Sequence, residues 1–266
     1  MAQARRFAIK HKKPIISWLH DVTQATQVVF DTCALQTDTT STDLKREFPE
    51  LTFYFVEGAP AVIKDNLSTT RGITNGTSCT LRSITLREDT TEEAAATFWQ
   101  QVQQAKPGEV IYMSKPPLSV NVQLPSELTT RISIPSLEED RTIIPMTVVK
   151  TGSRFRTLKL LRARGDHTSQ CGYYDHSLDL AFAITYHKAQ GRTLDRVLLV
   201  FNDVGRAKMT VSSLYVGLSR VRHSSHLRIL SISNRQRQTL EKLSFRNELI
   251  KWWGDMIAND RMLSSS

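Results

Sequence analysis

The sequence predicts an α/β fold in which a parallel sheet with helices on its faces is interrupted by a small β-rich insertion. Apolar, strand-like runs alternate with helical segments at both ends of the chain, as in parallel sheets covered on both faces. In the middle, short β-prone runs are separated by proline, glycine and polar clusters, a pattern typical of a small barrel. We therefore expect three segments, at 1–105, 106–172 and 173–266.

The first segment is predicted to contain strands followed by a surface helix. Runs at 14–18, 52–56 and 61–64 are apolar enough for buried strands, and a further β-rich run follows the tight-turn pair Asn75-Gly76. A helix is expected over 90–105, since Thr90 or Thr91 can cap it and acidic residues occupy its first turn.

The middle segment is predicted to be a small β-barrel. Its expected strands lie at 110–113, 118–124, 131–134, 142–149 and 155–161. The last of these lies in a stretch, SRFRTLKLLRAR, that alternates basic and apolar residues. Such a stretch suits either a nucleic-acid path or a solvated strand face.

The third segment returns to alternating helices and strands, with two polar motifs at the ends of apolar stretches. A short helical piece around 186–191 precedes a buried strand at 194–201, and a helix at 209–221 precedes a strand at 227–233. An amphipathic helix over 232–253 is expected to close the fold.

Composition favours a soluble, intracellular globular protein, with the compartment left open. The chain has 266 residues, 40% of them hydrophobic, and no apolar run reaches the ~20 residues that cross a bilayer. Residues 1–13 lack the apolar centre of a signal peptide. The cysteines are far apart and form no CxxC pair, which indicates reduced thiols; they are Cys33, Cys79 and Cys171.

Positive charge is concentrated in the C-terminal part. Residues 141–266 hold 21 Lys+Arg and 9 Asp+Glu, a net charge of +12, which leaves −3 for residues 1–140 of the total of +9. A polyanion-binding surface would explain this asymmetry, although ribosomal, membrane-surface and merely soluble proteins also have a high pI.

The first polar motif is suited to binding anionic oxygens. It places hydroxyl, imidazole, ammonium and amide groups beside a glycine within one turn: Thr185, His187, Lys188, Gln190 and Gly191. These groups offer several donors, and the glycine lets a backbone approach closely. Phosphate is the natural ligand, and it can belong to a nucleotide or to a nucleic-acid backbone.

The second motif ends an apolar stretch with Ser219, Arg220 and Arg222. A guanidinium is always charged and presents planar donors, so Arg220 could neutralise charge on a transferring phosphoryl group. The alternative is an arginine at a helix end, where basic side chains are favoured. Arg222 fits phosphate contact and plain surface equally well.

In order and spacing, the two motifs resemble motifs V and VI of superfamily-1 DNA helicases, in the RecD-like branch that includes the petite-integration-frequency helicases. The resemblance implies a second RecA-like motor domain interrupted by a small β-barrel. It assigns Thr185, His187 and Lys188 to single-stranded DNA, and Gln190 and Gly191 to ATP. It makes Arg220 the arginine finger that completes the nucleotide site.

The resemblance covers only the C-terminal half of such a motor. The chain has no GxxxxGK[ST] and no DExx box, the elements that hold phosphates and Mg²⁺ in P-loop enzymes. ATP and Mg²⁺ are therefore expected as cofactors of a complete enzyme with an N-terminal motor half, in DNA repair or recombination, and the chain alone is expected to be inactive. A truncated gene model, a fragment and a degenerate copy remain open. A non-catalytic module that binds single-stranded nucleic acid is the alternative function.

No metal site is predicted. His167, Cys171 and His176 have irregular spacing and lack a fourth ligand. Gly165-Asp166 with Gln170 resembles a helicase motif III, but it has the wrong spacing and order. Trp252 and Trp253 could stack on bases, yet adjacent residues point to different faces of a helix.

Overall fold

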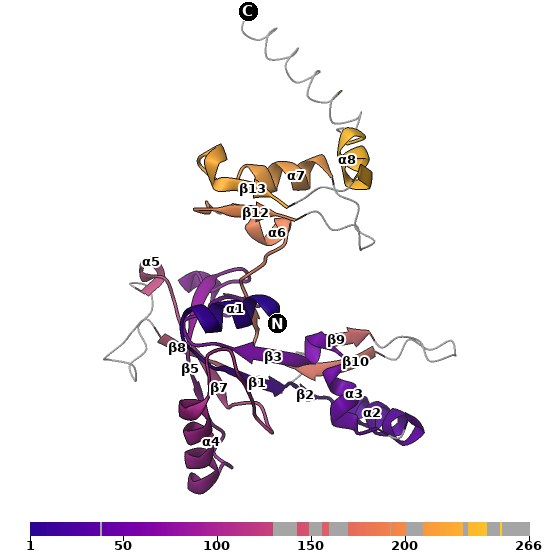
Figure 1. The fold of residues 1–266 in the computed structure, drawn as a ribbon, viewed down its shortest axis with the longest axis vertical. Coiled ribbons are helices and arrows are strands. Elements are labelled where there is room, and N and C mark those ends of the chain that lie inside the picture. Colours follow the sequence, from indigo (N-terminus) through magenta and orange to yellow (C-terminus); the bar gives the residue numbers. More distant parts are fainter. Residues whose placement is uncertain are drawn as a thin grey trace, which may run out of the picture. The chain divides into compact units, whose positions relative to one another are not determined.

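A computed structural model describes residues 1–37, 39–129, 143–148, 156–159, 170–191, 193–200, 210–230, 234–243 and 251. It divides into two compact units, residues 1–183 (unit 1) and 184–266 (unit 2). Figure 1 shows the elements of each unit. In the described ranges, no helix combines the length and apolar character that a bilayer span requires.

The first sheet of unit 1 is built around β1 (Ile15–Leu19). This strand pairs antiparallel with β3 (Thr52–Phe55) and parallel with β6 (Val110–Tyr112). Its residues up to Trp18 are buried, as expected of an apolar strand inside a sheet. The predicted strands at 14–18, 52–56 and 110–113 are confirmed here.

The second sheet of unit 1 has five antiparallel strands in the order β11-β4-β5-β7-β8. They are β11 (Leu178–Leu180), β4 (Pro60–Ile63), β5 (Ser78–Thr85), β7 (Ser119–Gln123) and β8 (Ile143–Thr147). The predicted turn at Asn75-Gly76 lies between β4 and β5, and Gly76 adopts a φ of 94° that suits glycine. Its N–H donates to the Ile63 carbonyl over 2.7 Å.

A third sheet joins β2 (Asp21–Val22), β10 (Gln170–Tyr174) and β9 (Arg156–Lys159). The buried carboxylate of Asp175 follows β10 and pairs with Lys64 and, over 3.4 Å, with Arg156. Burial alone would raise the pKa of Asp175, but these two cations outweigh it and hold the pKa below its usual value.

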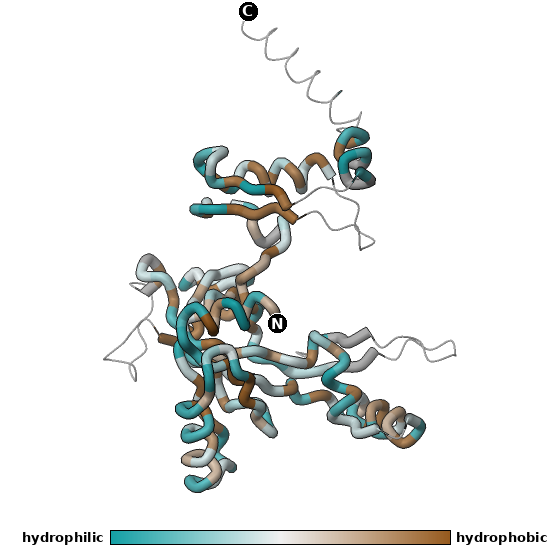
Figure 2. Tube along the Cα trace, viewed as in Figure 1, coloured by the Kyte–Doolittle hydropathy of each residue, from teal (hydrophilic) through white to brown (hydrophobic). Residues whose placement is uncertain are grey.

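The described residues of unit 1 form the helices α1 (Ala2–Lys10), α2 (Gln24–Thr37), α3 (Ser41–Arg46), α4 (Glu92–Gln104) and α5 (Ser126–Thr129), with 3₁₀ turns η1 (Pro49–Leu51) and η2 (Thr69–Arg71). The predicted helix over 90–105 is confirmed as α4. Its cap is Thr91, whose side chain accepts the Ala94 N–H. In Figure 2, α4 is largely hydrophilic.

The main core of unit 1 lies between its first two sheets and α1. Trp18, Ile15, Leu81 and Val120 are almost completely buried in it, and Ala4 and Ala8 anchor α1. A smaller cluster of Phe30, Leu51 and Tyr173 fixes α2. Small residues on α1 let its backbone approach the sheet closely, which explains how so polar a helix is held.

Unit 2 contains α6 (Tyr186–Ala189), β12 (Val197–Leu199), α7 (Val211–Leu218), η3 (Ser224–His226), β13 (Leu227–Ile229) and α8 (Asn234–Glu241). β12 and β13 pair in parallel. A helix between two parallel strands is the expected crossover arrangement, and Figure 2 shows hydrophobic stretches on β12 and α7. The predicted order of elements from 186 to 229 is confirmed.

The predicted α/β class is therefore confirmed, with parallel pairs at β1–β6 and β12–β13. Antiparallel pairs are more numerous in the described part of unit 1, because β4, β5, β7 and β8 run alternately up and down. β7 and β8 of the predicted barrel join a sheet that also contains β4, β5 and β11. The boundaries of the segments 1–105, 106–172 and 173–266 stay a prediction. The expected strand at 131–134, His167 and the two final tryptophans lie outside the described residues.

Candidate nucleotide and nucleic-acid site

The first polar motif forms a single helical turn and its two ends. Thr185 lies immediately before α6, and its carbonyl accepts the Ala189 N–H over 3.0 Å. His187 and Lys188 belong to α6 itself. Gln190 is exposed after the helix, where its N–H donates to the Tyr186 carbonyl over 3.1 Å.

Gly191 ends this turn with a φ of 76°, the left-handed conformation that glycine adopts without strain. Apart from its chain neighbours, no atom of the described residues would lie within 4 Å of a Cβ built at this position. The glycine is therefore required by its conformation and not by crowding. Among the described residues, its backbone is open to the close approach of a ligand oxygen.

The second motif follows α7. This helix begins after Thr210, whose hydroxyl accepts the Ser213 N–H over 3.1 Å as an N-cap. At its far end, a Cβ built on Gly217 would lie only 2.7 Å from Tyr186 Cε1 and 2.9 Å from Leu199 Cδ2. Glycine at this position lets α7 pack directly on α6 and β12, which brings the two motifs together.

Arg220 is fixed at the end of α7. Its Nε donates to the Val216 carbonyl over 2.9 Å, and a terminal nitrogen donates to the Ser219 hydroxyl over 2.8 Å. Its own carbonyl accepts the Leu194 N–H over 2.8 Å. The arginine thus satisfies a helix-end carbonyl, as the alternative interpretation proposed, and it is also tied to the segment that follows Gly191.

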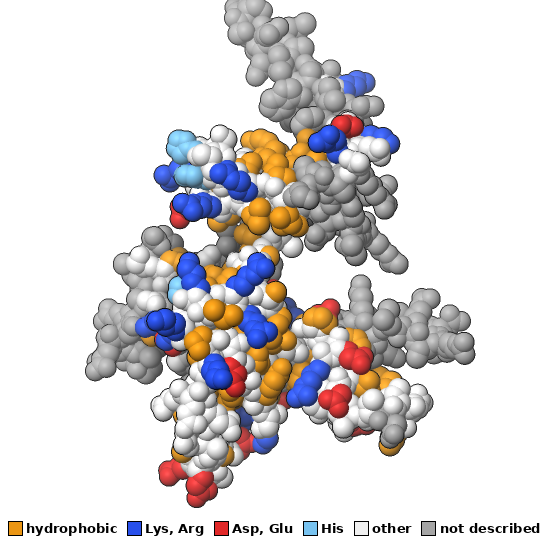
Figure 3. Space-filling view, viewed as in Figure 1, with side chains coloured by type: hydrophobic (Ala, Val, Ile, Leu, Met, Phe, Trp, Pro, Cys, Tyr) orange, Lys and Arg blue, Asp and Glu red, His pale blue; other side chains and the backbone are white. Residues whose placement is uncertain are grey.

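Further positive charge surrounds this end of α7. Figure 3 shows Lys, Arg and His side chains gathered at one end of unit 2. Exposed basic groups follow Arg220 along the chain and continue into β13; they are Arg222, His223, His226 and Arg228. His223 and His226 have ring centroids 5.7 Å apart. Such a surface suits an extended polyanion.

Of the three residues His167, Cys171 and His176, the structure describes the side chain of His176. His176 is buried in unit 1, where Nε2 lies 3.1 Å from the Pro117 carbonyl and the ring packs edge-on against Trp18. Among described residues, no three His, Cys, Asp or Glu side chains lie close enough together to hold a metal ion.

Sequence reasoning missed the residues that position the site. Gly217 lies in the apolar stretch before the second motif, where an isolated glycine inside a helical pattern signals close packing. Leu194 gave no signal, because it contributes through its backbone N–H. Tyr186 also gave none, and its buried hydroxyl has no hydrogen-bond partner in the part of the chain that is described.

We expect Gly217→Val to destabilise unit 2 by about 1–3 kcal/mol, the usual cost of overpacking. The added atoms must displace Tyr186 or Leu199, which separates α7 from α6. Hydrogen exchange of the α6 and α7 amides measures this. Ser212→Val on the exposed side of the same helix is the matched control, and equal exchange rates in the two variants would contradict the packing argument.

Comparison with known proteins bears on this region. Residues 160–250 match the herpes helicase family model, whose description is Helicase. This part of the chain is similar to that helicase family. It contains every predicted site residue, so the predicted helicase resemblance is confirmed for this segment. A search of the curated proteins finds no match to the chain.

Solved helicase structures align with most of the chain. The Pif1 helicase from Candida albicans aligns over 96% of this chain and 47% of its own, at 14% identity and a TM-score of 0.45. Bacteroides Pif1 bound to ssDNA aligns over 97% of this chain and 44% of its own, at 15% identity and a TM-score of 0.44. The chain therefore spans less than half the length of these two structures.

Proposed function

We propose that the chain is the C-terminal motor domain of an ATP-dependent DNA helicase, which binds single-stranded DNA and completes the ATP site of an N-terminal motor half. The observation that carries this proposal is the Leu194–Arg220 hydrogen bond, because it joins the segment after Gly191 to the arginine of the second motif. The helicase family match over 160–250 supports it.

In this proposal the two motifs have separate partners. Thr185, His187 and Lys188 contact the DNA strand, because hydroxyl, imidazole and ammonium groups suit backbone phosphates. Gln190, Gly191 and Arg220 face the nucleotide.

The donors fit a triphosphate but do not replace a complete site. Arg220 would bring a fixed positive charge to the transferring phosphoryl group, and Gly191 would allow close backbone approach. ATP and Mg²⁺ would be held chiefly by the P-loop and acidic residues of the other half. ATP supplies the phosphoryl group, while the residues of this chain orient it and offset its charge.

The alternative is a non-catalytic module that binds single-stranded nucleic acid. The absence of a GxxxxGK[ST] motif from the 266 residues favours it. ATPase assays of the chain with and without an N-terminal motor half separate the two functions. The motor proposal expects no turnover alone and DNA-stimulated turnover on mixing. Failure to restore turnover, with DNA binding retained, would favour the alternative.

We expect Lys188→Ala and His187→Ala each to weaken binding of an oligothymidylate several-fold. Neutralising a phosphate releases counterions, so loss of one contact by Lys188 should reduce the slope of log K against log salt by about 0.7. Fluorescence anisotropy across a salt series measures both quantities. Lys242→Ala, an exposed lysine that follows α8, is the control. An equal effect in the control would show that only net charge matters.

A further inference from the structure

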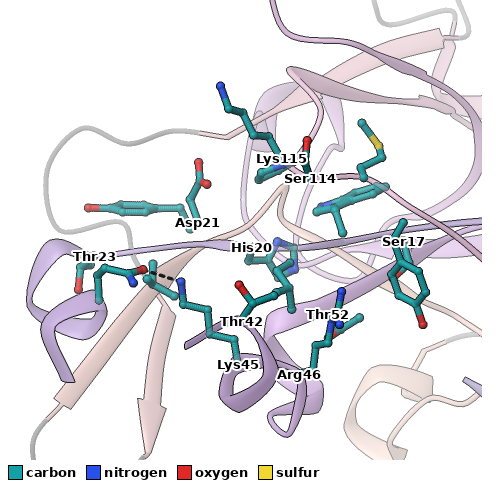
Figure 4. A pocket seen from close by; sticks show the side chains of 18 of the residues that line it. Ser17, His20, Asp21, Thr23, Thr42, Lys45, Arg46, Thr52, Ser114 and Lys115 are labelled. Atoms are coloured by element: carbon teal, nitrogen blue, oxygen red, sulfur yellow. Dashed lines mark hydrogen bonds between the residues drawn. The ribbon is translucent and has the colours of Figure 1, made fainter. Parts of the chain in front are cut away.

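Unit 1 contains a pocket at the carboxyl ends of its two parallel strands, β1 and β6 (Figure 4). The pocket has a volume of about 640 Å³, within the range of small-molecule sites. The Met113 N–H donates to the Ser17 carbonyl over 2.8 Å and holds the two strand ends together. Open α/β sheets bind ligands beyond the carboxyl ends of parallel strands, so the position is that of a ligand site.

Lys45 of α3 supplies the best-placed cation of this pocket. Its ammonium donates to the neutral Gln27 amide oxygen, the contact drawn as a dashed line in Figure 4. The same ammonium lies 5.9 Å from the centre of the Phe30 ring. Partial burial lowers the pKa of Lys45, although Asp31 and Asp21 act to raise it. Its charge is therefore incompletely compensated, and an anion in the pocket would stabilise it.

The other charged groups of the pocket contribute less. Arg46 lies over the Tyr112 ring at 5.2 Å and is 3.5 Å from Asp43. Lys115 is paired with Asp89 over 2.8 Å. These pairings leave Arg46 and Lys115 as secondary cations. Asp21 is the acidic residue of the lining, and Arg87 lies 3.9 Å from its carboxylate.

Neutral polar groups complete the lining, and one of them has a buried nitrogen without a hydrogen-bond partner among the described residues. His20 is 6% exposed, and burial lowers its pKa to about 3, so its imidazole is neutral near pH 7. Its Nδ1 is buried without a hydrogen-bond partner among the described residues. A buried nitrogen without a protein partner is commonly hydrogen-bonded by water or by a ligand. Hydroxyls from Thr23 and Thr42 line the same space.

We propose that this pocket binds a phosphate ester, with Lys45 as its principal cation and Thr23, Thr42 and His20 as neutral hydrogen-bonding partners. None of these residues belongs to the two motifs, so the inference goes beyond the proposed function. The beginning of α2, immediately after Thr23, adds the partial positive charge of a helix N-terminus. The ester is either a free nucleotide or a phosphate of a nucleic-acid strand.

Lysine labelling of the full chain tests the proposal without an activity assay. An amine-reactive acylating reagent modifies the neutral amine, and a bound oxyanion raises the pKa of an ammonium. Adenosine monophosphate should therefore slow labelling of Lys45 several-fold and leave labelling of the exposed Lys10, at the end of α1, unchanged. Adenosine, which lacks the phosphate, should not protect. Peptide mass spectrometry reads each site separately.

The ligands distinguish the two sources of phosphate. Protection by adenosine monophosphate identifies a free nucleotide, whereas protection by an oligothymidylate alone identifies a strand phosphate. No protection by either would overturn the proposal. Lys45→Met should abolish the binding of the protecting ligand in calorimetry, with Lys10→Met as control, and undiminished binding would also overturn it.

The proposed function fails independently of this pocket. Suppose that Lys188→Ala and His187→Ala leave oligothymidylate binding intact while adenosine monophosphate still protects Lys45. This result would contradict the assignment of the first motif to DNA and support phosphate-ester binding in the pocket. If Lys45 is never protected while both motif variants lose DNA binding, the phosphate-ester proposal for the pocket is contradicted and the assignment of the first motif to DNA is supported.

Discussion

In a motor completed by an N-terminal half, Arg220→Ala is expected to lower DNA-stimulated ATP turnover by about 10³-fold or more, the effect of removing an arginine finger. The charge acts chiefly on the transition state, so the loss should appear in kcat with little change in KM. Steady-state ATPase assays at saturating DNA measure it.

Fold integrity has to be followed alongside, because Arg220 also bonds the Val216 carbonyl. Loss of that bond should cost about 1 kcal/mol, which a melting curve detects and which cannot account for a thousandfold loss of turnover. Arg228→Ala is a matched control, since this exposed arginine donates to the Ser225 carbonyl in the same region. Near-normal turnover in Arg220→Ala would contradict the assignment of Arg220 as an arginine finger.

Lysine at position 220 separates charge from geometry. An ammonium keeps the positive charge but lacks the planar fork and the Nε that reaches Val216 in the described structure. We therefore expect Arg220→Lys to recover only a small part of the lost turnover. Full recovery would mean that a point charge is sufficient at this position.

The elements of the fold could be predicted where one local signal dominates. Thr91 caps α4, Gly76 lies in the turn between β4 and β5, and Gly191 ends α6, because residue type strongly favours helix capping and left-handed backbone at such positions. Strand partners were less predictable. The strand at 119–123 joins a sheet with residues 78–85, a pairing that depends on contacts distant in sequence.

The candidate site shows the same limit. Its chemical groups are visible in the sequence, since Thr185 to Gly191 and Ser219 to Arg222 are compact motifs. The contacts that assemble them are not, because the Leu194–Arg220 bond uses backbone atoms of residues 26 positions apart. The pocket of unit 1 also could not be predicted, because Lys45, His20 and Ser114 come from three separate segments of the chain.

Acid is expected to destabilise unit 1 from about pH 6.5 downward, because two buried histidines are held neutral. His20 is 6% exposed and His176 1% exposed. Burial lowers the pKa of His20 to about 3, with Asp175 acting in the opposite direction. Burial also lowers the pKa of His176, against the raising effect of its contact with the Pro117 carbonyl. In the unfolded chain both imidazoles should titrate near 6.5.

The direction of this pH dependence follows from proton binding to the unfolded chain. Below pH 6.5 the unfolded state takes up protons that the folded state excludes, so the free energy of unfolding falls as the pH falls. For His20 this continues down to a pH of about 3. Each histidine lowers the free energy of unfolding by up to about 1.4 kcal/mol for each unit by which the pH falls. The carboxylates of Asp65 and Asp175 have lowered pKa values, so their contribution is lost only below the ordinary pKa of 3.8.

Urea unfolding at intervals from pH 7.5 to 4.5 measures this slope above the carboxylate range. His20→Gln and His176→Gln each remove one titrating group, so each should flatten the pH dependence even if it lowers stability at pH 7.5. His11→Gln, at the exposed residue that follows α1, should leave the slope unchanged. A slope in His20→Gln equal to that of the parent chain would show that the buried imidazole takes no part in acid unfolding.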